Sequence, residues 1–248
     1  MPLPPRLVLA SASPRREALL RRLAAGFTIL ASGAEEGTAA QPSRAFPPLQ
    51  LPAPFAVPPP DHPVLWAWRK ALAVAPSATA DGRDALILGA DTIVVHDGDV
   101  LQKPADLEDA RQMLQRLSGR THLVITGWAF VYARPGADAR EAAVTQYGYV
   151  RSAVRMHAND ADRIAWYVGT GEPLDKAGAY AVQGQGGALV ARVDGCYTNV
   201  VGLPLCAVRT ALAALGWPVR RGVDWHPDCA GPYCTPPQSA WIAEEAGA

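Results

Sequence analysis

Apolar residues recur along the chain in short unbroken runs, and these runs predict the strands of a central sheet. The run at residues 7–10 is followed at once by turn-forming residues, which is typical of a buried strand. The stretch ALILGADTIVV at 85–95 is almost wholly apolar, so we expect a central strand with both faces covered. Residues 122–133 and 142–157 indicate two more strands, and residues 27–31 indicate a short one.

Apolar residues at helical spacing predict five helices among these strands. In the first, Ser13 stands where an N-cap belongs, Pro14 suits the first helical position, and Gly26 is expected to end the helix. Asn159 is expected to cap a helix that runs to about residue 168. The other predicted helices span residues 64–74, 107–117 and 204–215. Because strands and helices alternate, the predicted fold class is α/β.

Three segments depart from this regular pattern. The stretch AYAVQGQGGALVARVDG, which begins at residue 179, predicts two strands joined by a glycine-rich turn. Residues 42–63 contain nine prolines and predict an irregular, partly extended insertion. Residues 217–248 show no periodicity, so we expect one domain over residues 1–216 followed by a peripheral tail.

The composition narrows the classes of protein that the chain can belong to. Of its 248 residues 49% are hydrophobic, which is enough for a sizeable core, and 23 basic residues balance 23 acidic ones. A net charge of zero argues against stable, sequence-independent binding to nucleic acid. Four cysteines form no visible disulfide framework, and neither a secretory signal nor a membrane span is recognisable, so we expect a cytoplasmic protein.

Two consecutive arginines at a helix start are the first candidate for chemistry. With Ser13 as N-cap, Arg15 and Arg16 fall at the second and third helical positions, where the helix dipole disfavours cations. An anionic ligand reverses this effect, because free backbone N–H groups, serine hydroxyls and guanidinium groups together form a phosphate site. The alternative is a solvated arginine pair.

Asp91 is the second candidate, because a carboxylate within an apolar strand is costly unless it is paired or binds a metal. Such carboxylates serve as general bases and as Mg²⁺ ligands. Lys70 and Lys103 are candidate partners for this carboxylate or for phosphate, and Glu36 of the pair Glu35-Glu36 is a candidate metal ligand. The alternatives are an aspartate in a strand-ending turn, a solvated lysine and a solvated acidic pair.

Two later stretches are dense in polar groups beside glycines. GEPLDKAGAYAVQG at 171–184 favours a binding loop, whereas the polar residues of GCYTNVVGLPL at 195–205 could equally hydrogen-bond a turn. The polar residues in question are Glu172, Asp175, Lys176, Gln183, Tyr197 and Asn199.

Six of these fragments occur in the order found in one family. LASASPRREALL, GADTIVV, KPAD, TGW, GEPLDKAGAYAVQG and YTNVVGLPL resemble the Maf family of nucleotide pyrophosphatases over about residues 6–215. The resemblance implies a cytoplasmic enzyme, a hydrolase acting on acid anhydrides, that converts a nucleoside triphosphate to the monophosphate and pyrophosphate with Mg²⁺ or Mn²⁺. It also implies a fold like the inosine triphosphatases, with a mixed central sheet, flanking helices, a cleft between two lobes and often a homodimer.

The resemblance also implies roles for single residues. Asp91 corresponds to the family's proton acceptor beside the metal, and Glu36 falls where a family acidic residue sits, although the usual Asp-Glu here reads Glu35-Glu36. The triphosphate would be held by Ser11, Arg15, Arg16, Lys70 and Lys103.

Three positions indicate the branch of the family that acts on dTTP and UTP. These positions carry Arg15, Thr92 and Gln183 in this chain, and the tryptophan of the branch acting on 7-methyl-GTP is missing. The glutamine amide both donates and accepts, which suits the imide edge of uracil or thymine. Alternatives are the 7-methyl-GTP activity, hydrolysis of modified nucleotides, and a non-enzymatic nucleotide-binding regulator of septum formation.

The tail offers one further candidate site. His226, Cys229 and Cys234 resemble zinc ligands, but their spacing is loose and no fourth ligand is obvious.

Overall fold

The computed structural model describes residues 5–32, 62–136 and 143–220. Its strands are β1 (Arg6–Ala10), β2 (Thr28–Ile29), β3 (Ala85–His96), β4 (Asp99–Leu101), β5 (Thr121–Ala133), β6 (Ala143–Met156) and β7 (Val190–Asp194). Its α-helices are α1 (Pro14–Leu23), α2 (Pro63–Ala73), α3 (Ala75–Ala78), α4 (Leu107–Leu117), α5 (Ala161–Val168), α6 (Tyr197–Val201) and α7 (Leu205–Ala214). Three 3₁₀ helices are η3 (Glu172–Asp175), η4 (Ala177–Ala179) and η5 (Gly184–Leu189).

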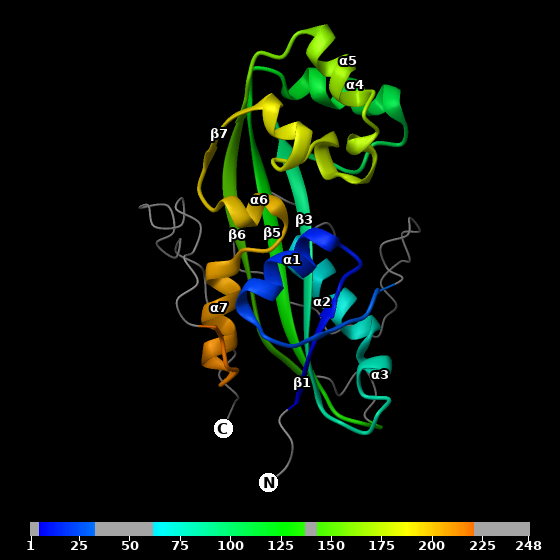
Figure 1. Cartoon of the computed structure of the whole chain (residues 1–248), viewed down its shortest axis with the longest axis vertical. Helices are drawn as coiled ribbons and strands as arrows, with labels where there is room; N and C mark the ends of the chain where they lie inside the picture. The colour runs from blue at the N-terminus through cyan, green and yellow to red at the C-terminus, as the bar shows by residue number, and fades with distance from the viewer. Residues whose placement is uncertain (1–4, 33–61, 137–142, 221–248) are drawn as a thin grey trace.

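The strands form one seven-stranded mixed sheet in the order β2-β1-β3-β5-β6-β7, with β4 paired to β3. β2, β1 and β3 are parallel, whereas β3, β5, β6 and β7 are successively antiparallel. The three long strands β3, β5 and β6 run the length of the molecule (Figure 1). Helices α4 and α5 lie at one end of these strands, and α1, α2, α3 and α7 surround the other end (Figure 1).

Side chains alternate between the two faces of β1 and β3 and give each face its own core. Leu7 and Leu9 pack with α1 and α7, whereas Val8 and Ala10 pack with α2 and α3. A third cluster joins α4 and α5 to the far ends of the long strands. The expected α/β class and the covering of both faces of the central strand are therefore confirmed.

Helix α2 lies unusually close to the sheet because two glycines face it. A Cβ on Gly89 would lie 1.9 Å from the carbonyl oxygen of Ala67, and one on Gly127 would lie 2.3 Å from the backbone nitrogen of Val64. Neither glycine can be replaced without moving the helix. This close packing fixes the height of Lys70 above β3.

Two expected helix ends are wrong by a few residues. Helix α1 ends at Leu23 instead of continuing to Gly26, because Ala24 is buried and turns to extended backbone toward β2. Helix α5 is capped by Asp160, whose carboxylate accepts from the Arg163 backbone N–H at 2.8 Å. Asn159 instead donates to the carbonyl of Leu189.

The expected strand pair within residues 179–195 is also wrong, because only β7 is a strand. The preceding glycine-rich stretch folds into η5, and Gly184 has a φ of +68°. The N–H groups of Gln185 and Gly186 donate to the Glu172 carboxylate instead of to a neighbouring strand. A tertiary contact that the alternating pattern does not reveal thus replaces the hairpin.

The proline-rich stretch 42–61, Glu35, Glu36 and the tail beyond residue 220 lie outside the described residues. Among the helices that are described, none has the length and apolar character needed to cross a membrane.

Candidate active site

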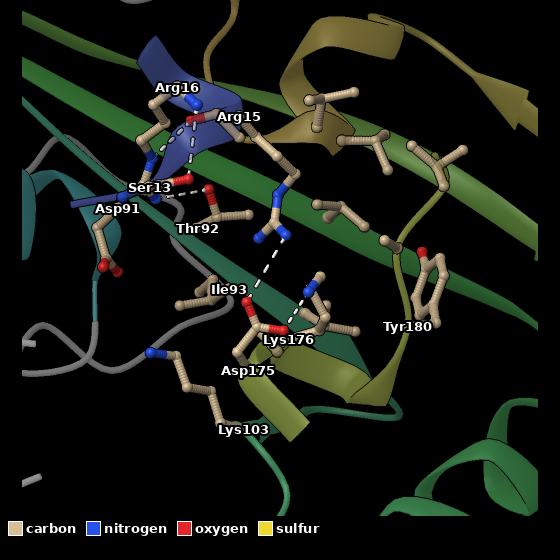
Figure 2. A pocket seen from close by; sticks show the side chains of 18 of the residues that line it. Ser13, Arg15, Arg16, Asp91, Thr92, Ile93, Lys103, Asp175, Lys176 and Tyr180 are labelled. Atoms are coloured by element: carbon tan, nitrogen blue, oxygen red, sulfur yellow. Dashed lines mark hydrogen bonds and ion pairs between the residues drawn. The ribbon is translucent and has the colours of Figure 1, made fainter. Parts of the chain in front are cut away.

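A cavity of about 600 Å³ opens between the start of α1, the middle of β3 and the segment 175–183 (Figure 2). Its wall also includes residues of α2 and α6. The lining includes the cations Arg15, Arg16, Lys70, Lys103 and Lys176 and the acids Asp91 and Asp175. The cavity therefore carries excess positive charge in a chain with no net charge.

Asp91 and Lys70 form a part-buried ion pair in the wall of this cavity. Lys70 Nζ lies 2.8 Å from Asp91 Oδ1, and the two side chains are 7% and 18% exposed. Asp91 lies in mid-strand opposite Gly127, and not in a strand-ending turn. The ammonium group compensates the carboxylate charge that burial would otherwise make costly. This pair accounts for a charged residue within an almost wholly apolar strand.

Arg15 faces the cavity from the second position of α1. Its side chain is 32% exposed, and Nη1 lies 3.9 Å from Asp175 Oδ2 across the opening. Lys176 forms an ion pair with the same carboxylate (Figure 2). Asp175 thus lies between two cations that a triphosphate would also attract.

Arg16 is buried and is fixed by contacts within the protein. Its Nε donates to the carbonyl of Gly202 at 3.0 Å, and Nη1 and Nη2 donate to the hydroxyl oxygens of Ser11 and Thr92 at 3.3 and 3.2 Å. The consecutive arginines therefore differ, since Arg15 extends across the cavity whereas Arg16 links α1 to β3 and α6.

The two serines before α1 shape this corner. Ser13 caps the helix as expected, accepting from the Arg16 backbone N–H at 3.5 Å. The Ser11 hydroxyl is 1% exposed and contacts the Ser13 N–H and Arg16. Ser11 is not among the residues that line the cavity, and its expected contact with phosphate stays a prediction.

Thr92 belongs to a buried network that crosses the sheet. Its hydroxyl lies 2.9 Å from that of Thr126, which donates to the carbonyl of Asn199 at 2.8 Å. The Asn199 side chain, which is 0% exposed, donates to the carbonyl of Val124 and to the hydroxyl of Ser152. Thr126 was not predicted from the sequence, because threonine is an ordinary residue in a strand and its partner Asn199 is distant along the chain.

Lys103 and Gln183 both line the cavity and are exposed, as a ligand-binding role requires. In Figure 2 Lys103 extends from the segment after β4. Lys176, which the sequence analysis placed only in a polar loop, also lines the cavity with a side chain that is 11% exposed. The structure thus brings Asp91, Arg15, Arg16, Lys70, Thr92, Lys103 and Gln183 around one space.

Tyr180 closes another part of the wall and is held from behind. Its hydroxyl lies 2.7 Å from Nε2 of the buried His122. Burial and, to a smaller extent, the nearby His96 lower the pKa of His122 to about 4, so the ring is neutral near pH 7. Burial raises the pKa of Tyr180, which keeps its hydroxyl protonated.

Among the described residues, the cavity offers Asp91 as one ligand for a divalent metal but not a complete set of ligands. Within residues 5–32, 62–136 and 143–220 no group of three or more His, Cys, Asp or Glu side chains is placed to bind a metal ion. Mg²⁺ commonly needs only one or two carboxylates when substrate phosphates supply further oxygens. Lys70 contacts Oδ1 of Asp91, and a carboxylate can accept at both oxygens, so Asp91 suits this role.

The chain matches the profile of the family described as "Maf-like protein" over residues 6–215. The chain belongs to this Maf-like family. The relatives include a protein of Moorella thermoacetica that is 46% identical over 211 residues, covering 85% of this chain and 95% of the relative. Others are from Geobacter metallireducens, 44% identical over 87% of this chain and 99% of the relative, and Symbiobacterium thermophilum, 43% identical over 87% and 97%. All three relatives are named dTTP/UTP pyrophosphatase.

The Maf-like match spans every strand and helix that the structure describes, from Arg6 of β1 to Ala214 of α7. Both walls of the cavity lie inside it, including Asp91 and the segment 175–183. The candidate active site therefore lies within the region that matches the family.

Proposed function

We propose that this chain is a nucleoside triphosphate pyrophosphatase that hydrolyses dTTP and UTP to the monophosphate and pyrophosphate. The Asp91–Lys70 pair in a cation-lined cavity carries the proposal within a family whose relatives bear that name. Anhydride hydrolysis needs a positioned base for water and cations for the phosphates, and this cavity contains both.

The phosphates bind to the cations of the cavity. Arg15, Lys103 and Lys176 present their charges to the space, and Arg15 and Lys176 exchange Asp175 for phosphate oxygens. Arg16 is held by protein contacts and orients the start of α1, whose N–H groups favour anions. These groups also stabilise the charge that develops on the departing pyrophosphate.

Asp91 is the general base. A water oxygen attacks the α-phosphorus, the bond from that phosphorus to the bridging oxygen breaks, pyrophosphate leaves, and the water proton passes to Asp91. Lys70 Nζ, 2.8 Å from Oδ1, keeps the carboxylate in place.

A divalent metal, Mg²⁺ or Mn²⁺, would be held by the carboxylate of Asp91 and by oxygens of the substrate phosphates. When bound it would neutralise phosphate charge and lower the pKa of water. Glu36 remains the proposed second ligand from the protein.

Base recognition is assigned to Gln183, whose exposed side chain lines the cavity. Its amide can pair with the imide edge shared by thymine and uracil and absent from cytosine. Thr92 acts by holding Arg16 and Thr126.

Turnover by Asp91→Asn tests the proposal. The variant keeps an oxygen for Lys70 but cannot accept the proton, so release of pyrophosphate from dTTP and UTP should fall by about 10²–10⁴-fold. Asp99→Asn is the matched control, because Asp99 is also ion-paired, to Arg116 at 2.7 Å, but does not line the cavity.

The nucleotide panel should include CTP, GTP and 7-methyl-GTP, each with Mg²⁺ or Mn²⁺. If the wild-type protein hydrolyses only 7-methyl-GTP, the proposal that dTTP and UTP are its substrates is wrong. If the protein binds dTTP but releases no pyrophosphate, it is a nucleotide-binding regulator and not an enzyme. Full activity in Asp91→Asn would remove Asp91 from the mechanism.

A further inference from the structure

The carboxylate of Glu172 accepts three hydrogen bonds and lies outside the lining of the cavity. Oε1 accepts from the Tyr167 hydroxyl at 3.1 Å and from the Gly186 N–H at 3.3 Å, and Oε2 accepts from the Gln185 N–H at 3.2 Å. Neither Glu172 nor Tyr167 lines the cavity. Any effect of these two residues on a ligand must therefore pass through the residues they hold.

Tyr167 holds the other end of the same segment. Its hydroxyl accepts from the Ala181 N–H at 3.2 Å while it donates to Glu172, and the residue is 0% exposed. Burial raises the pKa of Tyr167, so the phenol remains a donor at any ordinary pH.

These contacts bracket Gln183. Ala181 and Gln185, two residues before and two residues after it, are held by the phenol and the carboxylate, whereas Gln183 itself is exposed in the cavity. Close packing leaves the bracketed loop little room, because a Cβ on Gly186 would lie 2.4 Å from the carbonyl oxygen of Ala181. The position of Gln183 is therefore set by Glu172 and Tyr167.

Glu172 also contacts the cationic side of the cavity through its backbone. Its carbonyl oxygen accepts from Lys176 Nζ at 3.3 Å. One residue thus orients a cation through its main chain and the Gln183 loop through its side chain.

We infer that Glu172 and Tyr167 are positioning residues for base selectivity, which they exert by holding the loop that presents Gln183. The inference rests on the proposed function, because it assigns the base edge to Gln183. Selectivity through an amide requires accurate placement, since an amide that is free to shift or rotate can pair with either a donor or an acceptor edge.

Tyr167→Phe is the first test, because it removes one oxygen and leaves the ring. The ratio of kcat/KM for dTTP to that for CTP should fall at least fivefold, with kcat for dTTP changed less than twofold. Tyr132→Phe is the matched control, because Tyr132 also donates to a carboxylate, that of Asp84, outside the cavity. Its ratio should equal the wild-type ratio.

Glu172→Gln is the second variant and serves if Tyr167→Phe does not fold. The amide nitrogen would face backbone N–H donors, so the loop should shift and the ratio should fall in the same direction. In a Gln183→Ala background neither substitution should lower the ratio further, because the group they position is missing.

Two failures are distinguishable in this experiment. If wild-type protein releases no pyrophosphate from any nucleotide, the proposed function fails, and the ratio of the dissociation constants for dTTP and CTP, measured by calorimetry, replaces the kinetic ratio. A wild-type ratio in both variants, even with lowered thermal stability, would overturn the inference and leave Glu172 and Tyr167 with a purely structural role.

Discussion

Thr92 and Arg16 connect the chemistry of the cavity to the interior of the sheet. Thr92 receives Arg16 on one side and contacts the Thr126 hydroxyl on the other, so a helix start, β3 and β5 share one polar chain. Buried polar chains are stable when each member is satisfied and are disturbed when one is removed. The guanidinium of Arg16 therefore has a fixed position before any ligand arrives.

Thr92→Val should lower both stability and activity, whereas Thr92→Ser should change little. Valine fills the same volume but removes a hydroxyl partner from Arg16 and Thr126, at a cost of about 1–3 kcal/mol in the free energy of unfolding. Denaturant titration and dTTP turnover measure the two effects. Equal stability of the valine and serine variants would show that the hydroxyl contributes nothing.

Single residues were predicted from the sequence where an unusual residue type interrupts a pattern. Asp91 and the arginine pair were noticed in this way, and they lie around the same cavity. Tyr167 and Thr126 were missed, because a tyrosine in a helix and a threonine in a strand are ordinary there. Their importance comes from partners at positions 172 and 199, which no local pattern reveals.

Helix α2 shows how an element carries a functional group to its place. Lys70 reaches Asp91 because the helix lies directly on β3 and β5 at Gly89 and Gly127. Because Gly89 and Gly127 have no side chains, α2 packs directly on the sheet, and this packing determines where the Lys70 ammonium group lies.

Gly89→Ala should move α2 away from the sheet. The added methyl meets backbone atoms of Ala67 that cannot rotate aside, so we expect a loss of about 1–3 kcal/mol and a weaker Lys70–Asp91 pair with reduced turnover. Gly26→Ala is the matched control, since no atom lies within 4 Å of the added Cβ. Thermal unfolding and dTTP turnover compare them, and a Gly89→Ala protein as active and stable as Gly26→Ala would contradict this account.

At the scale of elements the sequence predicted the long strands and most helices well. Unbroken apolar runs identified β3 and β5 almost to the residue, because burial on two faces leaves a strong pattern. The prediction from the sequence failed for the segment 177–189, where glycines and hydrogen bonds to distant residues determine the conformation. Helix α6 was missed because five residues are too few to show a period.

Two buried histidines make the stability of the whole molecule depend on pH. Burial lowers the pKa of His62 to about 4, and its Nδ1 accepts from the Val64 N–H at the start of α2. His122, with a pKa also lowered to about 4, supports Tyr180. Both rings must be neutral in the folded state, whereas the unfolded chain binds protons near the ordinary value of 6.5.

Stability should therefore fall between pH 6.5 and pH 4. Because the unfolded chain binds more protons than the folded one in this range, acid favours unfolding, and each histidine should cost about 2 kcal/mol at pH 5 relative to pH 7. Denaturant titrations at the two pH values measure the loss. His122→Gln should reduce it and the exposed His157→Gln should not; equal losses in both variants would remove His122 from the explanation.

The continuous strands β3, β5 and β6 have a consequence for how the molecule loses its structure. Residues 85–95 pair with 123–133 without interruption, and β6 continues the ladder, so one set of main-chain hydrogen bonds serves both ends of the molecule (Figure 1). We expect neither end to melt while the other stays intact, because melting would fray the strands on which all three core clusters rest. We therefore expect unfolding to be a single cooperative transition, in which a nucleotide bound in the cavity protects the α4–α5 end as well as the α1–α2 end.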